Sequence, residues 1–356
     1  MEKFLTLPDK NRKEVFEETA RKLEILSIIV EKDFWVCWTL KQLFSLPELG
    51  SLITFKGGTS LSKAYQLIDR FSEDIDLTIS RTARSFADVA DPMESDISGK
   101  ERQRRIDALK IGAQSFVADI AAPVLQHQFQ DALAKSDGWE ISLDADDKDK
   151  QTLSFSYPRL FNYGQGYGRG SFGVGRFGEG EFGYIKPMVK LEFGARGEIE
   201  PSTEKAITPY VADIYPQFFD APSYKVHVLT AERTFWEKVT ILHALYHGTK
   251  IRDRMSRHYY DTYLLAEKGI ADAALQDVSL LAQVVRNKSL MFADNKASYD
   301  TAKIGSLRLM PKPEALPELK RDYAAMAVMF TKPAPDFETM MQGIADLERK
   351  INGGGS

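Results

Sequence analysis

Cysteine is almost absent from this chain, which has a single one, Cys37, among 356 residues. One cysteine cannot form an internal disulfide, so the composition fits the reducing cytosol. Cys37 lies in the apolar run 34–38, and we interpret it as a core residue and not as a catalytic thiol. Long apolar runs and an apolar signal segment at the N-terminus are lacking too. We therefore predict a cytoplasmic protein without a membrane partner.

Several catalytic motifs are also missing. The sequence has no Gly-x-x-x-x-Gly-Lys-Ser/Thr loop, which disfavours a P-loop ATPase, and no Gly-x-Ser-x-Gly elbow. His243 and His247 have the spacing of zinc ligands, but no His-Glu-x-x-His motif surrounds them, so we do not expect a zinc site.

Charge of one sign does not dominate, since the net charge is −4, which argues against non-specific nucleic-acid binding over the whole surface. Residues 224–258 are locally basic, with seven Lys or Arg against three acids and four of the five histidines. This segment is either a surface that faces a polyanion or a solvated helix face.

Helical and strand patterns alternate in the first two thirds of the chain, and helical patterns dominate the rest. The sequence predicts helices within 10–47, 60–68, 83–136, 231–246, 256–268, 317–330 and 336–351. It predicts strands at 52–55, 75–79, 139–143, 152–157 and 187–193, and a connection without regular structure over 200–223.

Residues 163–183 are rich in glycine, interleaved with aromatic residues and arginines. Because glycine loses much backbone entropy on ordering, this composition predicts a loop or a loose hairpin. Its role is open between a flap that stacks on RNA bases and a tolerated surface insertion.

Two short segments carry the strongest chemical signal. Residues 55–62, Phe-Lys-Gly-Gly-Thr-Ser-Leu-Ser, place small residues in a turn that opens a helix, where backbone N–H groups can face phosphates. Residues 70–77 carry Asp74 and Asp76 at alternate positions of an apolar strand, so both carboxylates project from one face. Such a pair favours Mg²⁺ together with substrate phosphates. The two segments therefore predict metal-assisted transfer from a nucleoside triphosphate.

In this order, the two segments resemble the DNA polymerase β-type nucleotidyltransferase superfamily. The complete sequences of residues 31–36, 56–61 and 70–77 are similar to those of the AbiEii/AbiGii toxin family, which includes the MenT toxins. The similarity at Lys238 and 257–261 is looser. The pattern of elements and this resemblance together imply an α+β protein. We expect a polymerase β-like core, a mixed sheet with flanking helices, over 1–220, a helical C-terminal domain over 221–352 and a flexible tail over 353–356.

The resemblance also implies the site residues. Asp74 and Asp76 should bind Mg²⁺ or Mn²⁺ with a third carboxylate, for which we choose Glu192 because strand alternation places it beside Lys190. The alternative for Glu192 and Lys190 is an exposed ion pair. Further catalytic residues are Lys238 and Asp261, whose alternatives are a snorkelling lysine and an ion pair with Arg257.

Nucleotide contacts are expected from the turn and from basic side chains around it. The expected contacts are Gly57, Gly58, Thr59, Ser60, Lys63, Lys190 and Arg257. Lys63 can equally be a solvated helix residue, and Arg70 is expected to pair with Glu73. The family pattern has an arginine five residues after the lysine, where this chain has His243, so Arg252 or Arg257 is expected to substitute.

The resulting hypothesis is a magnesium-dependent nucleotidyltransferase toxin of a toxin–antitoxin or phage-defence system. It would transfer NMP from an NTP to an RNA acceptor, with Glu192 accepting the proton. The resemblance implies the tRNA 3′ end as acceptor and a cognate antitoxin as partner. Two alternatives stay open: NMP transfer to a protein Ser, Thr or Tyr hydroxyl, and an NTP-binding regulator without turnover.

Overall fold

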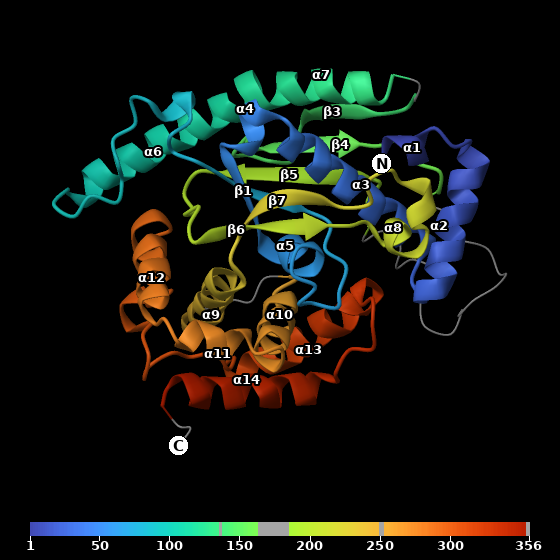
Figure 1. Ribbon diagram of the computed structural model, residues 1–356. Coiled ribbons are helices and arrows are strands. Elements are labelled where there is room, and N and C mark those ends of the chain that lie inside the picture. Colours follow the sequence, from blue (N-terminus) through green and yellow to red (C-terminus); the bar gives the residue numbers. More distant parts are fainter. Residues whose placement is uncertain (135–136, 163–184, 249–252, 354–356) are drawn as a thin grey trace.

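The computed structural model describes residues 1–134, 137–162, 185–248 and 253–353, and it centres on a mixed sheet in the order β3-β4-β5-β2-β1-β7-β6 (Figure 1). The strands are β1 (Ile53–Lys56), β2 (Ile75–Ile79), β3 (Glu140–Leu143), β4 (Thr152–Ser156), β5 (Met188–Gly194), β6 (Ser202–Ile207) and β7 (Tyr224–Leu229). All five predicted strands are present. The α+β class and the mixed sheet with flanking helices are confirmed.

The middle of the sheet sets the geometry of the site. β2 runs antiparallel to β1 and parallel to β5, and its Asp76 pairs with Lys56 on one side and with Glu192 on the other. Because paired residues in neighbouring strands share a face, Lys56, Asp76 and Glu192 form one row across the sheet. The next row, on the opposite face, consists of Phe55, Leu77 and Phe193, which are buried.

The N-terminal helices supply much of the apolar core. They are α1 (Glu2–Leu5), α2 (Asp9–Leu23), α3 (Ser27–Ser45), α4 (Pro47–Gly50) and α5 (Gly57–Lys63). In α3, Trp35 and Trp38 are buried against Phe155 of β4. The Trp35 ring meets Phe155 edge-on at 5.9 Å between ring centroids, and the Trp38 ring stacks on it at 5.6 Å. Cys37 is fully buried in the same helix, which confirms its assignment to the core.

A long helix lies along the β3–β4 side of the sheet (Figure 1). It comprises α6 (Gly99–Ser115), the π-helical turn η2 (Phe116–Ala121) and α7 (Ala122–Ala132), after the short 3₁₀ turn η1 (Arg84–Phe86). In the part of the chain that the structure describes, Gly99–Ala132 is one helix long and apolar enough to cross a membrane. This is weak evidence for a span, because core helices meet the same criterion, and here Phe116 and Phe129 are fully buried.

The C-terminal helices lie together on one side of the sheet (Figure 1). This part contains α9 (Ala231–His247), α10 (Ser256–Glu267), α11 (Ile270–Leu275), α12 (Ser279–Met291), η5 (Tyr299–Thr301), η6 (Pro313–Ala315), α13 (Leu316–Ala325), η7 (Met326–Met329) and α14 (Phe337–Ile351). The short α8 (Tyr210–Ile214), which is followed by η4 (Pro216–Phe218), packs instead against α2 and α3 (Figure 1). The hydroxyl of Thr230 accepts the N–H of Arg233 and caps α9, as the sequence predicted.

The structure differs from the sequence prediction in several places, and the helices α8, α11 and α12 were not among the predicted ones. Residues 87–98 are not helical, and α5 begins at Gly57 and ends at Lys63. β6 and β7 were not predicted, and β7 belongs to the sheet although it lies in the segment 221–352 assigned to the helical domain. β7 was missed because its apolar alternation covers only six residues. It is a strand because it pairs with β6 and with β1. The glycine-rich segment 163–183 lies outside the described residues.

Candidate active site

Three acidic side chains converge at the middle of the sheet. Asp76 and Glu192 are Cα partners on the parallel strands β2 and β5, and Asp74 directly precedes β2. Glu192 is accessible to solvent, but partial desolvation and the charges of Asp76 and Asp74 raise its pKa to about 7. Burial likewise raises the pKa of Asp76, and the charges of Lys56 and Arg257 oppose that rise. The third carboxylate chosen from strand alternation therefore lies beside the first two.

The donor set has the chemistry of a divalent-metal site. Carboxylate oxygens are the ligands that Mg²⁺ prefers. The pKa of Glu192 is raised first by desolvation and then by repulsion from Asp76 and Asp74, and a bound cation relieves that repulsion. In the described ranges, no three His, Cys, Asp or Glu side chains are arranged to hold a metal ion as they stand. Asp74, Asp76 and Glu192 thus fit a metal by donor type and by charge.

The two glycines after β1 touch the charged groups of the site. Gly57 has a φ of +78°, and a Cβ added there would lie 2.0 Å from Oδ2 of Asp76. A Cβ on Gly58 would lie 2.7 Å from Nη2 of Arg70 and 2.9 Å from Oγ of Ser72. Both positions therefore require glycine, since a side chain would displace the carboxylate or the guanidinium.

Asp261 of α10 joins two cations from distant parts of the chain. It accepts hydrogen bonds from Nε and Nη2 of Arg70, both at 2.8 Å, and from Nζ of Lys238 on α9 at 2.7 Å. Asp261 is fully buried, and Arg70 and Lys238 are about 5% exposed, so the three form a buried ion cluster. Burial alone would raise the pKa of Asp261, but the charges of the two cations outweigh it and lower that pKa. Burial lowers the pKa of Lys238. The expected pair of Arg70 with Glu73 is therefore corrected.

Glu73 instead bonds to Lys32 of α3, and the alternative Arg257–Asp261 pair is not formed. The Arg257 side chain is half-buried, and its Nε is a buried atom with no hydrogen-bond partner in the described residues. Its charge acts on Asp76, Glu192 and Lys238, which places it at the site. An unpartnered guanidinium next to carboxylates is suited to bind an anion bridged to them.

Lys190 lies on the same side of β5 as Glu192. It forms an ion pair of 2.5 Å with Asp144, and not with Glu192, so that alternative pairing is not found. Its pKa is raised by the hydrogen bond to Asp144, with smaller effects of Asp74 and Glu192. The ammonium group thus lies within electrostatic reach of the carboxylates.

Three expected nucleotide contacts bind other protein groups instead: Lys63, Thr59 and Ser60. Nζ of Lys63 lies 2.6 Å from Oδ1 of Asp33 and 3.9 Å from the centre of the Tyr210 ring. The hydroxyl of Thr59 donates to the carbonyl of Asp74 at 2.5 Å, and that of Ser60 to the carbonyl of Gly57 at 2.8 Å. We therefore leave the Lys63 ammonium and the two hydroxyls out of the proposed nucleotide contacts.

Sequence reasoning missed the role of the charged residues 31–33 in α3, although it used them for the resemblance. All three are buried, and each fixes a different segment. Glu31 accepts the N–H of Leu160, Lys32 bonds to Glu73 and to the carbonyl of Lys186, and Asp33 holds Lys63 and the N–H of Tyr210. Three consecutive charges in an apolar run were the available signal, because buried charges require partners.

His243, which replaces the expected arginine, is fully buried. Its Nε2 lies 3.0 Å from the carbonyl of Ser298, and its Nδ1 accepts the N–H of Arg308. It is thus a packing residue, and of the two expected substitutes Arg257 is at the site, whereas Arg252 lies outside the described residues.

The basic segment 224–258 does not form one exposed face. Arg233 is 1% and Lys238 6% exposed, whereas Lys225 and Arg254 are exposed. Neither a single polyanion-facing surface nor a solvated helix face describes it. The basic side chains of this segment divide between the interior and the surface.

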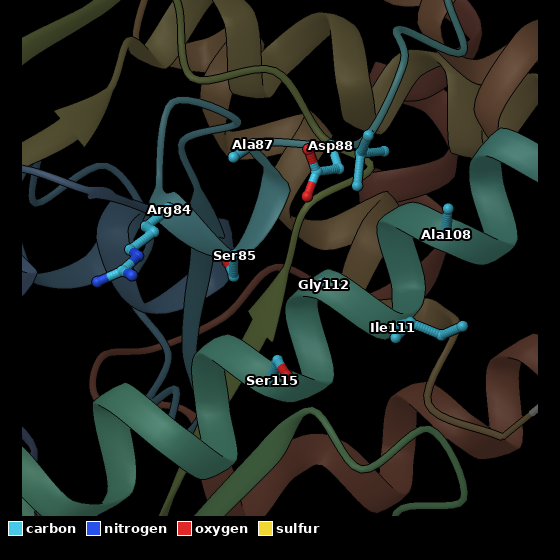
Figure 2. A pocket seen from close by; sticks show the side chains of 9 residues that line it. Arg84, Ser85, Ala87, Asp88, Ala108, Ile111, Gly112 and Ser115 are labelled. Atoms are coloured by element: carbon cyan, nitrogen blue, oxygen red, sulfur yellow. The ribbon is translucent and has the colours of Figure 1, made fainter.

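A surface pocket of about 320 Å³ lies elsewhere, between η1 and α6 (Figure 2). Arg84, Asp88 and Ile111 are among its lining residues, and none of the residues discussed above contributes to it. It is therefore separate from the carboxylate site.

Comparisons of the chain with known proteins identify a family and a similar solved structure. A family model described as "Nucleotidyl transferase AbiEii toxin, Type IV TA system" matches residues 38–343. A search of curated proteins gave no match. Among solved structures, the chain is similar to MenT4, a nucleotidyltransferase toxin from Mycobacterium tuberculosis H37Rv. The two are 14% identical with a TM-score of 0.39, over 94% of this chain and 98% of that one.

Proposed function

The chain belongs to the AbiEii family of nucleotidyltransferase toxins of type IV toxin–antitoxin systems, and we propose that it transfers NMP to the 3′ end of tRNA in a magnesium-dependent reaction. Family membership makes it a nucleotidyltransferase with an NTP substrate, a divalent metal in general and an antitoxin partner. The proposal adds four points to this: Mg²⁺ as the metal in place of Mn²⁺, tRNA as the acceptor, a role in phage defence, and action in the cytoplasm.

One observation carries the catalytic part of the proposal. Asp76 and Glu192 are paired on adjacent parallel strands, with Asp74 beside them and Gly57 in contact with the Asp76 carboxylate. The pKa of Glu192, raised to about 7 by burial and by the charges of Asp76 and Asp74, is an additional sign of function, because strongly perturbed carboxylates cluster at functional sites.

The reaction forms one bond and breaks one. The acceptor oxygen bonds to the α-phosphorus of the NTP, the bond from that phosphorus to the bridging oxygen breaks, and pyrophosphate leaves. Glu192 accepts the proton of the attacking hydroxyl. A divalent ion bound by Asp74, Asp76 and Glu192 would supply neutralising charge for the phosphates.

The cations around the carboxylates have two roles in this proposal. Arg257 and Lys190 contact phosphates, since one has an unpartnered Nε and both lie within electrostatic reach of the carboxylates. Asp261 is fully buried and acts as a positioning residue, which holds Arg70 beside Gly58 and fixes Lys238. Lys238 is 6% exposed and has one hydrogen bond to Asp261, so its remaining N–H groups can face the triphosphate.

Label transfer tests the proposal directly. The protein is incubated with each α-³²P-labelled NTP, Mg²⁺, unfractionated tRNA and a protein extract, and the labelled fraction is identified. We expect label on tRNA, and loss of at least about a thousandfold in rate in Asp76→Asn, with the exposed Asp96→Asn as matched control. Label on protein alone would favour protein NMPylation. Cell toxicity that persists in a folded Asp76→Asn variant would favour a regulator without turnover.

A further inference from the structure

A second group of charges lies beside the carboxylates and has no part in the reaction described above. It is the basic cluster of Lys56 on β1, Arg196 after β5, Arg233 on α9 and Lys288 on α12. Glu237 lies near Lys56, Lys288 and Arg233, with Oε1 3.5 Å from Nε of Arg233. Lys56 also acts on the carboxylate of Asp76, so the four cations have two carboxylates beside them, Glu237 and Asp76.

Contacts show that the four side chains belong to one cluster. Arg196 and Lys288 both face the ring of Phe292, with the guanidinium carbon and Nζ 4.5 and 4.7 Å from its centre. Burial lowers the pKa of Lys288. The charge of Glu237 opposes this shift, and the charges of Lys56, Arg233 and Arg196 add to it. The backbone after β5 is fixed there by Asn287, which donates to the carbonyl of Arg196 at 3.0 Å.

Arg233 is buried, and protein contacts satisfy part of its guanidinium group. Nη1 donates to the carbonyl of Glu200 at 3.2 Å, and Nε lies 3.5 Å from Oε1 of Glu237. The side chain is 1% exposed, and within the described ranges Nη2 has no hydrogen-bond partner. It also lies in the first turn of α9, where the helix dipole disfavours a cation and favours an anion. A buried guanidinium whose Nη2 has no partner, at a helix N-terminus, is suited to an incoming anion.

Sheet register shows where the cluster lies relative to the start of α5. β1 and β2 are antiparallel, with Thr54 opposite Thr78 and Lys56 opposite Asp76, so α5 leaves the sheet on the Asp74 side. Gly197 lies on the other side, because a Cβ there would be 3.1 Å from Oγ1 of Thr78 and 3.3 Å from Nζ of Lys56. Although Lys56 directly precedes α5, its ammonium group therefore lies toward Thr78, on the side of Asp76 away from the α5 turn.

We infer that the basic cluster binds a backbone phosphate of the RNA acceptor, and not the triphosphate of the NTP. In phosphoryl transfer, the attacking and leaving oxygens lie roughly in line on opposite sides of the phosphorus. With pyrophosphate on the α5 side, the acceptor approaches from the side of the cluster. The inference rests on the proposed function for the position of the triphosphate. A phosphate site favours a nucleic-acid acceptor over a protein hydroxyl.

Binding measured without catalysis tests the cluster. In an Asp76→Asn background, Lys288→Gln and Arg196→Gln are compared with the exposed control Lys148→Gln, using fluorescently labelled unfractionated tRNA and, separately, each NTP. We expect each cluster variant to weaken tRNA binding roughly fivefold to tenfold and to reduce the salt slope by about one. NTP affinity should stay within about twofold of the parent.

The outcomes separate this inference from the proposed function. Weakened NTP binding with unchanged tRNA binding would assign the cluster to the triphosphate and overturn the inference. Unchanged binding of both ligands, or no tRNA binding by the parent, overturns it as well. If tRNA binding depends on the cluster but no label reaches any RNA, the inference stands and the proposed function is wrong.

Discussion

Replacement of Glu192 by glutamine should remove activity and stabilise the fold at neutral and alkaline pH. Partial desolvation and the charges of Asp76 and Asp74 raise the pKa of Glu192 from its ordinary 4.5 to about 7. The folded state thus favours the protonated acid. Its contribution to stability is present below pH 4.5 and is lost as the pH rises through about 7.

The size of the effect follows from that pKa. Moving a pKa from 4.5 to about 7 corresponds to at most about 3 kcal/mol. Because the Glu192 side chain is exposed, solvent screening reduces this, and we expect about 1 kcal/mol. Glutamine is a neutral isostere, so Glu192→Gln should be more stable than wild type by about 1 kcal/mol at pH 8 and nearly equal to it at pH 5.

Urea unfolding at pH 5, 6, 7 and 8, in buffer with EDTA, measures the difference, with the exposed Glu140→Gln on β3 as control. The wild type should gain stability from added Mg²⁺ at pH 8, and the variant should gain less, because one ligand is missing. A difference between the two proteins that does not change with pH, or a variant less stable than wild type at pH 8, would refute the assignment of Glu192 to the carboxylate group.

Three other variants test separate parts of the site. Asp261→Asn should lower the free energy of unfolding, measured in urea, by about 3 kcal/mol or more, because it leaves the buried Arg70 and Lys238 without their counter-charge. An effect below about 1 kcal/mol would contradict the buried cluster. Gly57→Ala should lower kcat at least about a hundredfold, because the alanine Cβ would lie 2.0 Å from Oδ2 of Asp76 and displace that carboxylate. Near-normal kinetics would show that the close approach of residue 57 to Asp76 is not required. Lys63→Gln should lower the free energy of unfolding by about 2 kcal/mol, because it leaves the buried Asp33 without its partner. The KM for NTP should stay within about twofold of wild type. A large rise in KM with unchanged stability would instead show that Lys63 contacts the nucleotide.

Local patterns in the sequence predicted several elements of the site, although not the bounds of α5. The alternation of Asp74 and Asp76 with apolar residues predicted β2, whose observed bounds are Ile75–Ile79, and Thr230 marked the start of α9. The choice of Glu192 followed from alternation in 187–193, and β5 places it beside Asp76. These predictions succeeded because capping and strand alternation depend on residues a few positions apart.

The sequence by itself therefore determined the fold class, the family and the face on which the carboxylates lie. Only the tertiary structure decided the partners of the cations: Arg70 bonds to Asp261, 191 residues away, Lys63 to Asp33, and Glu73 to Lys32. It also placed β7 in the sheet and gathered Lys56, Arg196, Arg233 and Lys288 from four elements. The physical reason is that a buried charge pairs with whichever opposite charge the packing of distant elements brings near, and no short segment records that distance.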